Sequence, residues 1–210
     1  MTDEDVTAAV IRSGIVAILR APTADGFAAV ADVLIGAGIT ALEITLTSQG
    51  AIDAIAGLRR QLPASVAIGA GTVLTADDVK AAVDAGAAFL VSPVLDVPLV
   101  ASSPVPFYPG TSTPTEMFAA HRAGAPLVKL FPAAGLGPRF LRDVRAPLPQ
   151  LNVMPTGGVK IEDIADWLLA GAKAVGVGGP LIGDAATGGN VKALAARARH
   201  AVSAVAFARS

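Results

Sequence analysis

Short runs of apolar, mostly β-branched residues recur along the chain and predict buried strands. The runs are Ile15–Arg20, Ala41–Thr45, Val66–Ala70, Ala88–Ser92, Pro106–Tyr108, Leu127–Leu130, Asn152–Met154 and Ala174–Gly178. Their starts are 18 to 26 residues apart, and alanine-rich amphipathic stretches typical of helices separate most of them. The runs lack a clean alternation of polar and apolar positions, which is typical of parallel strands buried on both faces.

Glycine and hydroxyl residues mark where the intervening helices end and begin. Four stretches end in Ala-Gly directly before the next run, where glycine can take the left-handed conformation that stops a helix. These glycines are Gly38, Gly86, Gly124 and Gly171. Helix starts are predicted at Thr23, Thr75 and Thr113, where a hydroxyl precedes proline or acidic residues.

Eight strand–helix units predict an α/β fold of the (β/α)8 TIM-barrel type, in one domain that spans residues 1–210. The segment before Ile15 is expected to form an extra N-terminal helix that caps the bottom of the barrel. A doubly wound open sheet is the alternative, but we find no dinucleotide-binding fingerprint to favour it.

Composition removes several classes of function. A net charge of −1 gives no general electrostatic attraction to nucleic acid or to an acidic membrane, so we expect neither as a partner. The chain has no cysteine, and its two histidines, His121 and His200, lie far apart, so we expect no metal and no cofactor. The acidic N-terminal segment is unlike a signal peptide, which predicts a cytoplasmic location.

Two charged residues, Lys129 and Glu43, lie within otherwise apolar runs. Burial disfavours the charged form of a lysine, so its neutral amine becomes available as a nucleophile toward a ketone or aldehyde. A carboxylate nearby could serve as its acid and base. Two interpretations without chemistry remain open: Lys129 could extend to solvent from the strand end, or it could form a buried ion pair with Glu43.

Other polar and glycine residues follow the predicted strands, at the carboxyl-terminal end where barrel active sites lie. The glycine pairs Gly157-Gly158 and Gly178-Gly179 predict a phosphate-binding site made of backbone N–H groups. Arg20 could hold an anionic substrate. The segment with Gly71 and Thr72 lacks the ending of a nucleotide-binding loop and suits a carboxylate better.

Taken together, these segments resemble the 2-keto-3-deoxy-6-phosphogluconate (KDPG) and 2-keto-4-hydroxyglutarate (KHG) aldolases. The resemblance covers residues 14 to 183, most of the chain. It is carried by Leu42-Glu43-Ile44-Thr45, Ile68-Gly69-Ala70-Gly71-Thr72-Val73-Leu74, Val91-Ser92-Pro93, Tyr108-Pro109-Gly110, Val128-Lys129-Leu130-Phe131-Pro132-Ala133 and Pro155-Thr156-Gly157-Gly158-Val159.

The resemblance implies a metal-independent class I aldolase that forms a homotrimer and cleaves the small-molecule keto-acid sugar phosphate KDPG to pyruvate and glyceraldehyde 3-phosphate. It implies that Lys129 forms a Schiff base with the C2 ketone and that Glu43 moves protons through a water. It further implies that Thr72 and neighbouring amides hold the pyruvate carboxylate, and that the two glycine pairs hold the phosphate.

Two positions depart from the family pattern. Thr47 stands where many members carry an arginine that holds the carboxylate, and Arg20 is the candidate replacement. Gly179 stands where a serine is frequent, so one hydroxyl donor is missing from the predicted phosphate site.

Thr156 is similar to the residue that meets the C4 hydroxyl in the gluconate-type enzymes, and the galactonate-type relatives lack it. The C4 epimer 2-keto-3-deoxy-6-phosphogalactonate and KHG remain alternative substrates. A sugar-phosphate isomerase or epimerase and a non-catalytic sugar-phosphate binding protein are the alternative functions.

Overall fold

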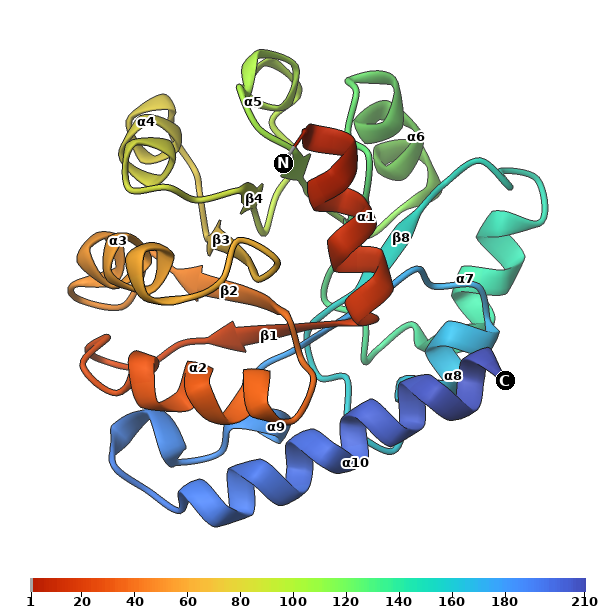
Figure 1. Ribbon diagram of the computed structural model, residues 1–210. Coiled ribbons are helices and arrows are strands. Elements are labelled where there is room, and N and C mark those ends of the chain that lie inside the picture. Colours follow the sequence, from red (N-terminus) through yellow and green to blue (C-terminus); the bar gives the residue numbers. More distant parts are fainter. Residues whose placement is uncertain (1) are drawn as a thin grey trace.

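The strands of the computed structural model, which describes residues 2–210, are parallel and surround a central axis (Figure 1). Six strands pair in the order β5-β4-β3-β2-β1-β9, and three more in the order β6-β7-β8. Proline at position 109 separates β5 from β6, which are consecutive parts of one strand. A parallel bridge from Thr156 to Gly176 joins β8 to β9 and closes the ring.

The predicted (β/α)8 barrel is therefore confirmed, and the open sheet is wrong. The strands are β1 (Ile15–Leu19), β2 (Ala41–Thr45), β3 (Ala67–Gly71), β4 (Phe89–Val91), β5 (Phe107–Tyr108), β6 (Gly110–Thr111), β7 (Val128–Leu130), β8 (Val153–Pro155) and β9 (Val175–Val177). Predicted strand ends differ from these by one residue at most, except that the fifth strand continues beyond its proline as β6.

Helices form an outer layer around the strands (Figure 1). They are α2 (Phe27–Gly36), α3 (Ala51–Gln61), α4 (Ala76–Asp84), α5 (Val97–Ser102), α6 (Pro114–Arg122), α7 (Gly137–Arg145), α8 (Ile164–Leu169), α9 (Gly179–Ile182) and α10 (Val191–Arg209), with a 3-10 turn at Ala185–Thr187. No helix in residues 2–210 is long and apolar enough to cross a bilayer.

The N-terminal segment forms α1 (Asp3–Ser13), which packs against β1, β2 and β3 and covers the lower end of the barrel as predicted (Figure 1). Val6 and Val10 of α1 join a core cluster of inward-facing side chains from the strands, which includes Tyr108. The hydroxyls of Thr7 and Tyr108 lie 3.2 Å apart and form a hydrogen bond. The barrel interior beneath α1 is thus filled with side chains.

Six of the seven helix ends predicted from local signals are correct. Thr75 and Thr113 are the N-caps of α4 and α6, and each forms a capping box with the acidic residue three positions on. The four Ala-Gly glycines take φ between 94° and 102°, the left-handed conformation predicted for them.

The helix start predicted at Thr23 is wrong, because α2 begins at Phe27 after Gly26. Thr23 instead forms a parallel bridge with Gln49, and its hydroxyl donates to Asp25. Pairing with a distant segment keeps this part of the chain extended, which a local capping signal does not reveal.

Candidate active site

Lys129 lies in the middle of β7, between Gly110 of β6 and Met154 of β8, and only 4% of the residue is exposed. The interpretation that it extends to solvent is therefore wrong. Burial lowers the pKa of the Lys129 ammonium; the Glu43 carboxylate opposes this shift and the Arg20 guanidinium adds to it. The Nζ atom lies 4.9 Å from the ring centroid of Phe131, on the same strand face. A larger share of this amine is thus neutral at a given pH than for an exposed lysine.

Glu43 lies in β2 and is 1% exposed. Burial raises the pKa of its carboxyl group, and the charges of Lys129 and Arg20 only partly oppose this. In the described residues, neither carboxylate oxygen of Glu43 has a hydrogen-bond partner. The ion pairs of these residues are the two surface pairs Lys80–Asp84 and Arg139–Asp143, and neither includes Glu43. The alternative of a Glu43–Lys129 ion pair is therefore wrong. Because an unpaired buried carboxyl group costs stability, its retention favours a role in chemistry.

Both side chains line a cavity of about 190 Å³ at the carboxyl-terminal end of the strands. Eight of the predicted site residues line it: Arg20, Glu43, Lys129, Thr156, Gly157, Gly158, Gly178 and Gly179. They come from β2, β7, the segments directly after β1, β8 and β9, and the start of α9, so the barrel brings together residues that are far apart in sequence.

Of the predicted carboxylate-binding residues, Arg20 lines this cavity, whereas Gly71, Thr72 and Thr47 do not. Thr72 directly follows β3 with φ 63°, and it is the single non-glycine residue in positions 2–210 with a positive φ. Its hydroxyl accepts a hydrogen bond of 3.4 Å from Nη2 of Arg20, which connects it to the cavity wall. Thr47 is exposed and donates to the hydroxyl of Thr45, and it does not line the cavity.

Gly71 provides the space that Glu43 occupies. A Cβ atom at position 71 would lie 2.0 Å from Oε1 of Glu43 and 2.6 Å from its Cδ. Any side chain at this position therefore requires the carboxyl group to move.

Replacement of Gly71 by alanine is expected to lower kcat by about tenfold to a hundredfold, because the displaced carboxyl group loses its alignment. Gly57→Ala is the matched control, since a Cβ at that helical position meets nothing within 4 Å. Steady-state kinetics of both variants, with circular dichroism to confirm folding, make the comparison. Equal activity of the two variants would show that Glu43 needs no such space.

Two of the four predicted phosphate-binding glycines have a positive φ. Gly157 and Gly158 follow β8 with φ of 87° and 77°, a conformation that other residues rarely adopt. Gly178 precedes α9 and Gly179 begins it. The hydroxyl of Thr156 donates to the carbonyl of Met154 and lies against Gly176, where a Cβ would be 2.4 Å from its Oγ1.

Several cavity residues were not predicted. Phe131 follows Lys129 by two positions and Ile18 precedes Arg20 by two, so the period-two alternation of a strand could have identified both. No sequence pattern indicates that Pro180, Ile182 and Gly183 line the cavity, because only the packing of α9 over the barrel brings them there.

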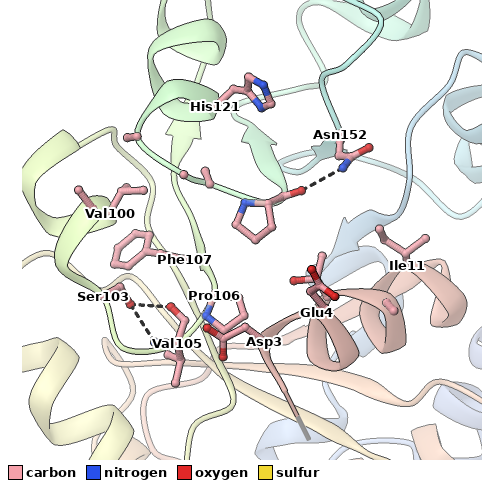
Figure 2. A pocket seen from close by; sticks show the side chains of 17 residues that line it. Asp3, Glu4, Ile11, Val100, Ser103, Val105, Pro106, Phe107, His121 and Asn152 are labelled. Atoms are coloured by element: carbon pink, nitrogen blue, oxygen red, sulfur yellow. Dashed lines mark hydrogen bonds between the residues drawn. The ribbon is translucent and has the colours of Figure 1, made fainter.

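A larger cavity, of about 670 Å³, lies at the opposite end of the barrel (Figure 2). Its walls are α1, the segment before β5 and the turns before β7 and β8, and its polar side chains include Asp3, Glu4, His121 and Asn152. Figure 2 shows that the side chain of Asn152 already forms a hydrogen bond, in which its amide donates to the carbonyl of Pro126. By volume alone, this cavity would be the better candidate for the active site. Lys129 and Glu43, however, line the smaller cavity, and barrel enzymes act at the carboxyl ends of their strands.

The site geometry agrees with the comparisons to known proteins. Residues 6–196 match the family model described as "KDPG and KHG aldolase". The chain belongs to this aldolase family. Membership supports lyase chemistry over the isomerase, epimerase and non-catalytic alternatives.

The names of this chain's relatives indicate different substrates. A probable 2-dehydro-3-deoxy-6-phosphogalactonate aldolase of Rhizobium meliloti (strain 1021) is 37% identical over 85% of this chain and 86% of its own length. A 2-dehydro-3-deoxy-phosphogluconate aldolase of Haemophilus influenzae is 39% identical over 73% of this chain and 74% of its own. Membership thus leaves the C4 configuration of the substrate open.

A solved structure of the KDPG aldolase from Legionella pneumophila superimposes on this chain with a TM-score of 0.84 at 28% identity. The match covers 92% of this chain and 96% of that one. That structure holds pyruvate captured at low pH as a covalent carbinolamine intermediate.

Proposed function

We propose that this protein is a class I aldolase that reversibly cleaves KDPG to pyruvate and glyceraldehyde 3-phosphate, with Lys129 as the Schiff-base residue. The observation that carries the proposal is a buried lysine of lowered pKa that shares one cavity with an unpaired buried glutamate. The covalent pyruvate adduct in the Legionella pneumophila relative supports it.

The proposed reaction begins when the neutral amine of Lys129 attacks the C2 ketone. The hydroxyl of the resulting carbinolamine takes up a proton from solvent and leaves as water. The product is a protonated imine, which withdraws electrons from the adjacent bonds. Glu43 takes the proton of the C4 hydroxyl, through a water, as the C3–C4 bond breaks. The bonding electrons form an enamine on C2 and C3, and C4 leaves as the aldehyde of glyceraldehyde 3-phosphate. The enamine then gains a proton at C3, and water releases pyruvate from the lysine.

Residues around this pair hold the two ends of the substrate. Arg20 and Thr72, joined by a hydrogen bond, bind the pyruvate carboxylate with the backbone of Gly71. Gly157, Gly158, Gly178 and Gly179 bind the phosphate through their N–H groups. Contacts at the remote phosphate orient the bond that breaks.

Thr156 is proposed to favour the gluconate configuration at C4, because it lines the same cavity as Lys129 and the glycine pairs. A coupled pyruvate-release assay with both C4 epimers, each with and without phosphate, tests this. We expect the phosphogluconate compound to give the highest kcat/KM. Preference for the galactonate epimer would contradict the stereochemical proposal, and failure to release pyruvate from any compound would contradict the aldolase itself.

We also propose a homotrimer. Large apolar side chains are exposed on consecutive segments around β3, β4, α5 and α6, a pattern common at subunit interfaces. They are Leu74, Val94, Val97 and Phe118. Light scattering coupled to size-exclusion chromatography should give three times the chain mass, and a monomeric mass would contradict this.

A further inference from the structure

The short helix α9 forms much of one cavity wall and cannot be stable on its own. It has four residues, and Gly179, Pro180 and Ile182 line the cavity. Isolated helices of this length are unstable in water, and the carbonyls of a last turn have no partner within the helix. The position of the Gly179 amide therefore depends on what holds the end of α9.

Arg197 of α10 holds that end. Its Nε donates to the carbonyl of Leu181 over 2.7 Å, and its Nη2 donates to the carbonyl of Ile182 over 2.9 Å. The planar guanidinium group thus binds two consecutive carbonyls at once. A positive charge at a helix C-terminus also interacts favourably with the helix dipole.

Gly183 makes this contact possible. It follows α9 with φ 57°, and a Cβ at this position would lie 2.6 Å from Nη2 of Arg197. The backbone turn and the absent side chain together leave room for the guanidinium group beside the last carbonyls of α9.

We propose that Arg197 is a positioning residue for phosphate recognition: from outside the cavity it fixes α9, so that the backbone amide of Gly179 is preorganised for the substrate phosphate. This inference rests on the proposed function of the glycine pairs. It adds that the affinity for phosphate depends on a side chain of the C-terminal helix that does not contact the substrate.

The test measures condensation of pyruvate with glyceraldehyde 3-phosphate and with unphosphorylated glyceraldehyde. Arg197→Ala should raise KM for the phosphorylated aldehyde by about tenfold, the factor that a charge-assisted hydrogen bond can supply. The KM for glyceraldehyde and the borohydride-trapped yield of pyruvate adduct should stay unchanged. Inorganic phosphate, used as a competitive inhibitor, should show an inhibition constant raised by a similar factor.

Arg199→Ala is the matched control, because it removes an exposed arginine from the same helix. Arg197→Lys should give an intermediate KM, since an ammonium has no planar fork to reach both carbonyls. This conservative variant carries the test if Arg197→Ala does not fold.

An equal rise of KM for both aldehydes, or wild-type values in Arg197→Ala and Arg197→Lys, would overturn the inference. A wild-type protein that neither traps pyruvate nor condenses it would instead overturn the proposed function. The two failures are therefore distinguishable.

Discussion

Replacement of Lys129 by alanine is expected to reduce pyruvate release from KDPG by more than about 10⁴-fold, because the reaction then lacks its nucleophile. In the wild-type protein, borohydride added with pyruvate should reduce the imine and attach a stable three-carbon adduct to Lys129. Peptide mass spectrometry should find the adduct on this residue and no adduct in the variant.

Lys160→Ala is the matched control for this experiment, since Lys160 is exposed and lies outside the cavity. It should keep both the activity and the adduct. An active Lys129→Ala protein, or an adduct attached to another lysine, would refute the role of Lys129.

Replacement of Glu43 by glutamine is expected to lower kcat by about 10²–10⁴-fold, the usual contribution of a positioned acid–base group. Glutamine keeps the volume of the side chain beside Gly71 but cannot accept the proton of the C4 hydroxyl. The borohydride-trapped pyruvate adduct should persist in this variant, because Lys129 is still present. Loss of the adduct together with activity would indicate a structural defect.

The pH profile tests the same residue independently. Burial raises the pKa of Glu43, so the carboxylate becomes protonated, and wild-type cleavage should decline, at a higher pH than for an exposed glutamate. Glu43→Gln should lose this acidic limb, whereas the control Glu162→Gln, at an exposed position, should retain it. An acidic limb that persists in Glu43→Gln would assign the titration to another group.

The strands could be predicted because the hydrophobic pattern of a parallel barrel is contained in short segments of the chain. Each strand is buried on both faces and appears as an apolar run, and several helix ends are marked by glycine or by a capping threonine such as Thr75. The prediction failed at Thr23, where a bridge to Gln49 overrides the local signal. Pairing between distant segments is not encoded in the residues around the cap.

The sequence by itself determined the barrel, the family and the residue types at the strand ends, because hydrophobic period, glycine positions and ordered motifs are properties of the linear chain. Tertiary structure alone decided that Lys129 and Glu43 are both buried and not paired with each other, since desolvation and distance depend on how the strands close. It alone decided that Gly71 makes room for Glu43 and that Arg197 reaches α9 from the C-terminal helix. These contacts join segments far apart in sequence, and only the packed barrel brings their atoms within a few ångströms.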